Sequence, residues 1–479
     1  MKKPLLLPAI LAAGLVLAAS PVAESDGNPD ALWPSWRGPR ATGAAPAANP
    51  PWIWSETKNV RWKVAIPGKG LSTPVIWGEK IFLTTAIPAG LRPDPETATR
   101  AEADLPEWRR ESGVAPDHVQ KFTVVALDRA SGAILWQRVL REESPHEGTH
   151  ADASWASASA VTDGDTLIVS FGSYGIYALD LNGALLWENN LGHMQTRRGF
   201  GEGGSPALAG NAVVINWDHE GPSFVTALDR RTGDLLWRRE RDEVTSWSTP
   251  VVVQVGEKSQ VVINATSRTR GYDLTTGDVV WEIEGMTVNT IPSPVAADGR
   301  LFVASGYRGA MLQAIDLDKA HGHLSGPPAV AWTYQQDTPY VPSLLLAQGR
   351  LYFLKGNTGI LTCLDAASGR ELFSRQRLEK IENVYASPVA AGGRVYITGR
   401  QGTTIVLDGG DTYKVLAVNH LEDAFDASAA VAGDGLYLRG RESLYCLAEG
   451  AAVSSAQSST RSTLLGTMHR NSNGASRTW

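Results

Sequence analysis

The stretch TALDRRTGDLLWRRE, residues 226–240, has four close copies elsewhere in this chain. They are ALDRASGAILWQRV (126–139), ALDLNGALLWENN (178–190), GYDLTTGDVVWEI (271–283) and CLDAASGRELFSR (363–375). Each copy has an apolar run that ends in Asp, a polar turn that contains Gly, and a second apolar run that ends near an aromatic residue. This order predicts a β-strand, a tight turn that needs the positive φ of Gly, and an outer strand.

The repeat extends along most of the chain when the sequence is aligned on its Asp. A front half precedes the Asp in each unit and is clearest in SPVAADGRLFVAS (293–305) and SPVAAGGRVYITG (387–399), which are typical of hairpins. Four short antiparallel strands in a unit of about 40–50 residues are typical of a propeller blade. We therefore predict an all-β fold, one eight-bladed β-propeller of four-stranded antiparallel blades over residues 54–450. The eight aligned positions are Asp128, Asp180, Asp229, Asp273, Asp316, Asp365, Asp408 and Ala448.

The last unit, residues 426–450, has only three predicted strands. The segment NVRWKVAIPG (59–68) near the other end matches the outer-strand pattern, with Trp62 in the aromatic position. We expect this N-terminal strand to complete the last blade and close the ring, because closure leaves no open sheet edge.

The aromatic residue of each outer strand is predicted to pack against the neighbouring blade. An aromatic ring offers a large flat face, and ring architectures need the same interface in every unit. The predicted docking residues are Trp62, Trp136, Trp187, Trp237, Trp281, Trp332 and Phe373.

Both ends of the chain differ in composition from the repeats. Lys2 and Lys3 followed by the apolar run 5–20 predict a signal peptide over residues 1–23, and an N-terminal extension follows at 24–53. We expect an exported, soluble, periplasmic or extracellular monomer without a transmembrane segment after cleavage. No cysteine near the signal could carry a lipoprotein anchor. The Ser/Thr-rich tail 451–479 is predicted to be disordered.

The charge and the cysteines exclude further classes. The net charge is −6 and no Lys/Arg cluster occurs, so nucleic acid is not an expected partner. The two cysteines, Cys363 and Cys446, take the same place in different units, which predicts buried and unpaired thiols.

The unrepeated residues gather just before the first strand of each unit. In a four-stranded blade these links lie on the same face as the loops between the second and third strands. We therefore expect one channel mouth that binds a small molecule or a peptide end, with Arg197 or Arg198 holding an anion. The alternative is a mouth that is solvated or satisfied by its own backbone. The candidates are Lys69, His150, Asp152, Trp155, Arg197, Arg198, Glu202, Trp247, Asn289, Tyr340, Tyr385 and Asp426.

Two insertions rise from the same face. Residues 88–120 interrupt the first unit and are rich in Pro and charge. Residues 216–223 contain Asp218, His219 and Glu220, which are metal-ligand types. Consecutive residues seldom converge on one ion, so no metal site is predicted and these three remain weak candidates.

The ALDxxTGxxxW repeat in eight blades resembles the PQQ-like β-propeller family, which includes quinoprotein alcohol dehydrogenases and BamB-type propellers. The resemblance covers nearly all of the chain after the signal, including WPSWRGPRATG (33–43), DGDTLIVSFGSYGIYALDLNGALLWENNLG (163–192) and SWSTPVV (246–252). Over this length it looks similar to secreted PQQ-like propellers of planctomycete-type bacteria.

The resemblance implies two opposed functions. Quinoprotein dehydrogenases hold pyrroloquinoline quinone (PQQ) under a ring of adjacent cysteines and beside calcium, and this chain has no adjacent cysteines. We therefore expect a non-catalytic envelope scaffold, or a module that binds a ligand or protein at the channel mouth, without a cofactor. The alternative is a PQQ-dependent dehydrogenase of alcohols or sugars with PQQ and calcium. A BamB-type assembly factor is a third class.

Overall fold

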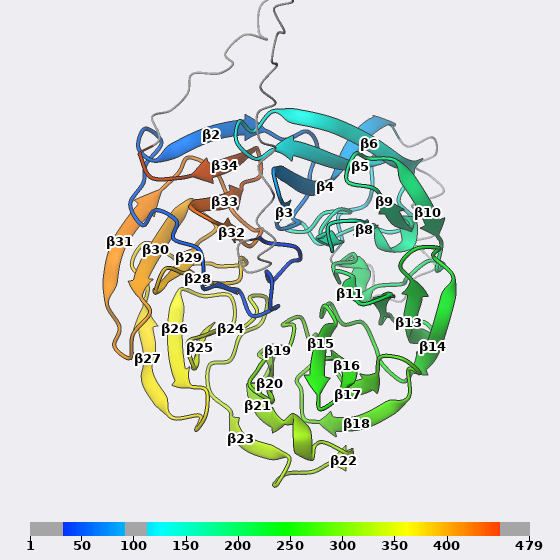
Figure 1. Ribbon diagram of the computed structural model, residues 1–479, viewed down its shortest axis with the longest axis vertical. Helices are drawn as coiled ribbons and strands as arrows, with labels where there is room; N and C mark the ends of the chain where they lie inside the picture. Colours follow the sequence, from blue (N-terminus) through cyan, green and yellow to red (C-terminus); the bar gives the residue numbers. More distant parts are fainter. Residues whose placement is uncertain (1–31, 92–112, 451–479) are drawn as a thin grey trace, which may run out of the picture.

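The computed structural model describes residues 32–91 and 113–450, which form a ring of eight antiparallel sheets (Figure 1). The predicted fold class is confirmed. Blades are numbered along the chain from the first hairpin. Blade 1 consists of β3 (Val75–Trp77), β4 (Lys80–Leu91), β5 (His118–Asp128) and β6 (Ile134–Glu143), and blade 2 of β7 (Val161–Thr162), β8 (Leu167–Ser170), β9 (Ile176–Leu179) and β10 (Leu185–Asn189). Blade 3 consists of β11 (Ala207–Ala209), β12 (Ala212–Trp217), β13 (Ser223–Asp229) and β14 (Leu235–Arg241). Blade 4 consists of β15 (Val251–Val255), β16 (Lys258–Ile263), β17 (Arg268–Asp273) and β18 (Val279–Glu284).

Blades 5–8 follow the same plan, except that the outermost strand of blade 8 comes from the start of the chain. Blade 5 consists of β19 (Val295–Ala297), β20 (Arg300–Ser305), β21 (Met311–Asp316) and β23 (Val330–Tyr334), and blade 6 of β24 (Leu345–Ala347), β25 (Arg350–Leu354), β26 (Ile360–Asp365) and β27 (Glu371–Arg377). Blade 7 consists of β28 (Val389–Ala391), β29 (Arg394–Thr398), β30 (Thr403–Asp408) and β31 (Val415–His420). Blade 8 consists of β32 (Ala430–Ala432), β33 (Gly435–Arg439), β34 (Ser443–Leu447) and β2 (Val60–Ala65). Short 3-10 turns are η2 (Gly172–Tyr174), η3 (Arg197–Gly199) and η4 (Leu317–Lys319).

The N-terminal strand closes the ring as predicted. β2 pairs antiparallel with β34, and Trp62 lies opposite Cys446. Both cysteines are buried and unpaired, also as predicted. Among the described residues no helix has the length and apolar character needed to cross a membrane.

The repeated Asp, Gly and Trp have separate local roles. The Asp229 carboxylate accepts the backbone N–H groups of Arg231 and Thr232, which shapes the turn. Gly233 follows with a φ of +76°, and a Cβ there would lie 2.8 Å from the ring of Trp187 in the preceding blade. The Trp187 indole N–H donates to the Arg230 carbonyl in the same turn. One turn therefore receives the aromatic ring of its neighbour.

The same contact recurs around the outer rim. The turn Gly of the next blade lies under the ring of Trp62, Trp136, Trp237 and Trp332 in turn. The ring centroids of Phe373 and Tyr413 are 5.8 Å apart. Trp281 differs, because its ring lies over Gly271 of its own blade. The turn of blade 5 is replaced by η4 and β22 (Gly322–Leu324), and β22 pairs in parallel with β18 as a fifth strand.

A second ring of contacts surrounds the channel. At one register of blades 2–8 a Ser or Thr hydroxyl accepts the backbone N–H of the matching residue in the preceding blade. The distance is 2.8 Å from Thr249 to Ser293 and 3.0 Å from Ser293 to Ser343. Seven such bonds run from blade 1 to blade 8, and Thr73 closes the circle by donating to the Ser428 carbonyl. The members are Thr73, Ser159, Ser205, Thr249, Ser293, Ser343, Ser387 and Ser428.

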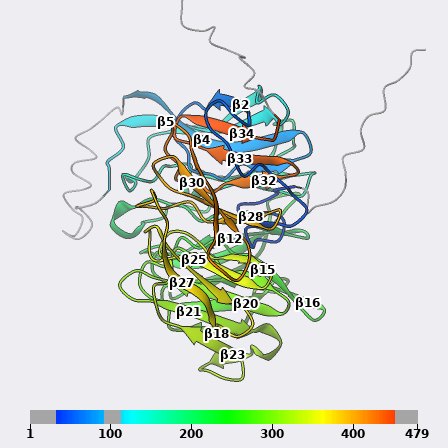
Figure 2. The ribbon, with the colours of Figure 1, turned by 90° about the vertical axis from the view of Figure 1, so that its left-hand side faces the viewer.

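The described part of the predicted N-terminal extension includes a segment that lies inside the channel. Residues 33–50, here called the plug, cross the centre of the ring (Figure 1) and lie toward one face (Figure 2). Trp33 pairs with Ile76, and β1 (Ala44–Ala45) pairs in parallel with β28. We call this face, which carries the Gly turns, the lower face. The upper face carries the links between blades.

Candidate functional site

A cup opens within the upper half of the channel, above the plug. Its volume is about 260 Å³, and Trp36 of the plug lines its lower end. Five aromatic side chains take part in the lining: Trp36, Phe200, Trp247, Tyr340 and Tyr385. Seven of the twelve predicted mouth residues meet here: His150, Asp152, Glu202, Trp247, Tyr340, Tyr385 and Asp426.

One side of the cup is an ion cluster contributed by three links and two loops. Arg400 donates from Nη2 to Asp152 Oδ1 at 2.6 Å and from Nε to Asp426 Oδ1 at 2.5 Å. Arg441 donates to Asp426 Oδ2 at 2.7 Å, and the Tyr385 hydroxyl donates to Asp152 Oδ2 at 3.1 Å. The hydrogen bond from Arg400 is the main reason that the pKa of Asp152 lies below its usual range. Blades 1, 2, 7 and 8 are thereby joined by charged contacts at the mouth.

The other side of the cup is mainly aromatic. Tyr340 stacks on Tyr307 with ring centroids 4.8 Å apart, and His150 meets Phe200 edge to face at 5.0 Å. The Trp247 indole N–H donates to the Gly201 carbonyl at 2.8 Å, which fixes the orientation of that ring. Flat apolar faces therefore stand opposite hydrogen-bonding groups.

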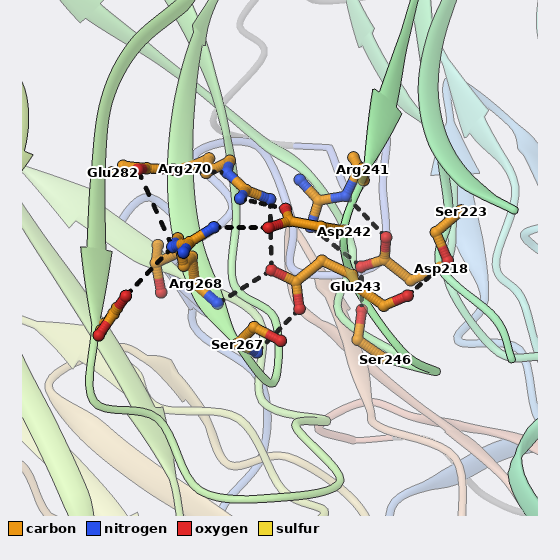
Figure 3. A network of polar contacts seen from close by, with 12 residues as sticks. Asp218, Ser223, Arg241, Asp242, Glu243, Ser246, Ser267, Arg268, Arg270 and Glu282 are labelled. Atoms are coloured by element: carbon orange, nitrogen blue, oxygen red, sulfur yellow. Dashed lines mark hydrogen bonds and ion pairs between the residues drawn. The ribbon is translucent and has the colours of Figure 1, made fainter.

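A buried polar network holds the link that carries Trp247 (Figure 3). Arg241 binds both oxygens of Asp218, and neither side chain is exposed. Ser246 donates to the same carboxylate at 2.6 Å. Glu243 accepts the backbone N–H groups of Ser267 and Arg268. These bonds tie the link from β14 to β15 to two blades, so Trp247 enters the cup on a rigid support.

Glu202 lines the cup in a largely enclosed position. Its carboxylate accepts from the Ser173 backbone N–H at 2.8 Å and from the Ser173 hydroxyl at 2.5 Å. Burial raises the pKa of Glu202 to about 8 in spite of these bonds, and Glu147 adds to the rise. At neutral pH this carboxyl is therefore mostly protonated and can donate a hydrogen bond.

His146, Glu147 and Glu202 bring ligand-type atoms within 4.8 Å of one another. The His146 ring has Tyr174 Oη on Nδ1 and the Met194 carbonyl on Nε2, so both nitrogens are in use. Glu147 accepts from the backbone N–H of Thr196. The partners of all three residues describe a satisfied polar cluster beside the cup.

The other five predicted mouth residues lie around the cup. Lys69 Nζ donates to the Ala151 carbonyl, and Trp155 donates to the Glu147 carbonyl. Asn289 is buried beside Tyr340 and contacts its hydroxyl. Arg197 and Arg198 belong to η3 and do not line the cup.

The three weak metal candidates are not brought together. Asp218 is bound by Arg241 and Ser246. His219 Nδ1 accepts the backbone N–H of Gln195, and its Nε2 faces the Pro222 carbonyl. Glu220 accepts from Thr245. Each of the three serves a different local contact.

Sequence reasoning missed Arg400, Arg441, Tyr307, Phe200 and Trp36. A usable signal existed for the first three. They lie in loops between second and third strands, which strand order already places on the upper face. The predicted mouth residues, by contrast, all lie in the links.

Comparisons with known proteins agree with this architecture. A family model described as "Outer membrane protein assembly factor BamB" matches residues 53–221 and 221–451. The chain belongs to this PQQ-like β-propeller family. BamB of Yersinia pestis is 23% identical over 354 residues, which cover 70% of this chain and 81% of that protein.

Two solved structures show the same fold at low identity. BamB from Moraxella catarrhalis matches with a TM-score of 0.51 and 15% identity over 70% of this chain and 95% of that one. A quinohemoprotein alcohol dehydrogenase from Comamonas testosteroni matches with a TM-score of 0.59 and 12% identity over 93% and 84%. At these identities the likeness establishes the fold alone.

The cup does not fit PQQ, which is a flat tricarboxylate. Trp36 and Trp247 offer faces for a planar ring, but the acidic groups that line the cup are Asp152, Glu202 and Asp426, and none of the lining residues is Lys or Arg. Arg400 is already bound to two of these carboxylates. The carboxylates of PQQ would therefore meet Asp152 and Asp426, whose charges Arg400 and Arg441 already balance, and no free cation in the described lining would hold them.

Proposed function

We propose that this family member is a non-catalytic binding module of the cell envelope that takes its ligand in the cup. The observation that carries the proposal is the convergence of unrepeated side chains from successive links on one closed-bottomed cavity. Elsewhere the blades repeat the same residues at the same positions. Such variety at one mouth serves no need of the ring itself.

The chemistry of the lining favours a ligand with an ammonium or other donor group beside an apolar part. Carboxylates and hydroxyls supply acceptors, and aromatic faces attract a cation. Arg400 already covers the Tyr385 ring at 4.2 Å from its centroid, so a ligand cation would lie against the other aromatic rings of the lining, those of Trp36, Trp247 and Tyr340. A small amine and the N-terminus of a partner polypeptide both carry such a group. The role of the BamB relatives, named as assembly factors, supports a polypeptide.

Calorimetric titration tests this proposal with matched probes. Tryptophanamide carries a free ammonium group, and N-acetyltryptophanamide has the same ring without it. We expect saturable binding of the first and at least tenfold weaker binding of the second. Tyr340→Ala should weaken binding about tenfold through lost aromatic contact, whereas Leu235→Ala on the exposed outer rim should not change it.

The alternative function is tested in the same preparation. PQQ with calcium should show no stoichiometric binding and no alcohol- or sugar-dependent dye reduction. Tight quinone binding with dye reduction would favour a dehydrogenase and contradict the binding module. Equal binding of the free and acetylated amides would contradict the predicted ligand class while leaving the cup as a site.

A further inference from the structure

Two arginines approach the rim of the cup on its aromatic side. Tyr340 of the cup wall stacks on Tyr307 with ring centroids 4.8 Å apart, and the Arg308 guanidinium carbon lies 5.3 Å from the Tyr307 centroid. These contacts connect the Arg308 charge to the cup through two rings. Arg197 lies within electrostatic reach of the same wall, because burial raises the pKa of Tyr340 while the Asn289 side chain and the Arg197 charge oppose that rise.

Neither arginine is neutralised by the protein. Arg308 is exposed and Arg197 is half-buried, and in the part of the chain that the structure describes neither guanidinium has a hydrogen-bond or ion-pair partner. Asp337, in the link from blade 5 to blade 6, pairs with two other cations. Glu220 accepts a hydrogen bond from the Thr245 hydroxyl, which in turn accepts the Arg197 N–H. Both guanidinium groups therefore offer donors to an anion that approaches from the upper face.

The loop that carries Arg308 is held in place by the neighbouring link. The Thr338 hydroxyl donates to the Ser305 carbonyl at 2.7 Å and accepts the Met311 N–H at 3.1 Å, so one side chain closes the base of the loop. A Cβ at Gly306 would lie 2.3 Å from the Thr338 carbonyl oxygen, so glycine permits this close approach of loop and link. The Arg308 charge is thus presented to the rim on a fixed support.

We propose that Arg308 and Arg197 form an anion subsite at the rim of the cup, which binds an acidic side chain near the N-terminus of a partner polypeptide. This rests on the function proposed above, in which the N-terminal ammonium group occupies the cup. An extended chain advances about 3.3–3.6 Å per residue, so a glutamate or aspartate a few residues after the first reaches the rim. Arginine binds carboxylates through two parallel hydrogen bonds, which suits this role. The partner class is a polypeptide with an apolar first residue followed closely by acidic residues.

Calorimetric titration with matched peptides tests the subsite. The acidic probe is a pentapeptide amide with a free N-terminal tryptophan, two glycines and two glutamates. The neutral probe has glutamines in place of the glutamates. The acidic probe should bind about tenfold more tightly at low ionic strength, and this advantage should shrink as salt screens the rim charges. Acetylation of the N-terminus should weaken the binding of both probes, as the function proposed for the cup requires.

Variants at the rim assign the acidic advantage to the two arginines. The double variant Arg308→Gln with Arg197→Gln should abolish the advantage and leave the affinity for the neutral probe unchanged. Arg308→Lys keeps a positive charge on the same loop, and it should retain more of the advantage than Arg308→Gln. Arg350→Gln is the matched control, because Arg350 pairs with Asp411 on the lower face, and it should bind both probes as wild type does.

Two outcomes would overturn the subsite alone. One is equal affinity of wild type for the acidic and neutral probes while the free N-terminus still binds better than the acetylated one. The other is an undiminished acidic advantage in the double variant, which would show that the anion binds elsewhere. A free N-terminus without any advantage over the acetylated one would instead contradict the function proposed for the cup, and with it the subsite as a part of that function.

Discussion

Neighbouring blades of this ring are joined at the outer rim and at the channel by different kinds of contact. At the rim, a tryptophan such as Trp187 lies over Gly233 of the next blade and bonds a carbonyl of that turn. At the channel, a hydroxyl such as Ser343 accepts the N–H of Ser293. The rim contact buries a large apolar area, whereas the channel contact saves one backbone group from being buried without a partner.

This difference explains at which positions the blades can differ in sequence. The rim needs one bulky residue and one glycine per blade, so both are visible in the sequence. The inner ring needs only a small hydroxyl, and the positions just above it are free to differ. The cup is built from those free positions. Repetition therefore marks the scaffold, and departures from it mark the site.

The largest expected effect lies at the rim. Trp237 is 6% exposed, lies over Gly277 and donates to the Leu274 carbonyl. Trp237→Ala should lower the free energy of unfolding by about 3–5 kcal/mol, from lost burial and the cavity left behind. Urea denaturation measures the change. Leu235 lies on the same strand and is 61% exposed. Leu235→Ala should therefore change the free energy of unfolding by less than about 0.5 kcal/mol. Equal losses in the two variants would refute the docking role.

Two glycines with the same backbone conformation distinguish the cost of backbone strain from the cost of a clash with an aromatic ring. Gly369 has a φ of +72° and a Cβ there would lie 2.6 Å from the Trp332 ring, whereas Gly349 has a φ of +73° and open space. Both changes to Ala cost about 1–2 kcal/mol for the left-handed conformation. Gly369→Ala should cost about 1–3 kcal/mol more from overpacking. Equal melting temperatures of the two variants would show that the aromatic contact does not constrain the turn.

Much of the scaffold could be predicted because each contact is local to a repeated position. The pairing of Trp62 with blade 8 followed from one missing strand and one unassigned strand pattern. Trp281 shows the limit, since its usual glycine partner is missing from the turn of blade 5 and the ring turns to Gly271. The plug could not be predicted, because Arg37 binds backbone carbonyls, which leave no trace in the sequence.

The candidate site was predictable in part for a similar reason. Strand order places every link on the upper face, so Asp152 and Asp426 were found from position alone. Their partner Arg400 lies in the loop between the second and third strands of blade 7, so the pattern of the links alone does not predict it. Trp36 required knowledge of where an unrepeated segment runs. Contacts between segments that no repeat relates are the ones that sequence patterns omit.

Glu202 connects the site to pH-dependent stability. Its folded pKa of about 8 lies above the ordinary 4.5, so the folded state binds more protons between these values. Stability should therefore fall as the pH rises from about 4.5 to 8, with a limiting slope of about 1.4 kcal/mol per unit from this group. Glu202→Gln should flatten the slope in urea denaturation at pH 5.5, 6.5 and 7.5. The exposed Glu240→Gln is the control and should leave the slope as in wild type. An unchanged slope in Glu202→Gln would mean that Glu202 is ionised in the folded protein.

The smallest expected effect lies in the inner ring. Ser343→Ala removes the acceptor of the Ser293 N–H and leaves that buried donor unpaired, which costs about 1–2 kcal/mol. Ser343→Thr should cost less, because Thr73 and Thr249 already occupy this register in other blades. Urea denaturation of the two variants, with hydrogen exchange at the Ser293 amide, measures the difference. A protected Ser293 amide in Ser343→Ala would show that water replaces the hydroxyl. The Ser343 hydroxyl would then contribute nothing to the free energy of unfolding that a water molecule does not supply.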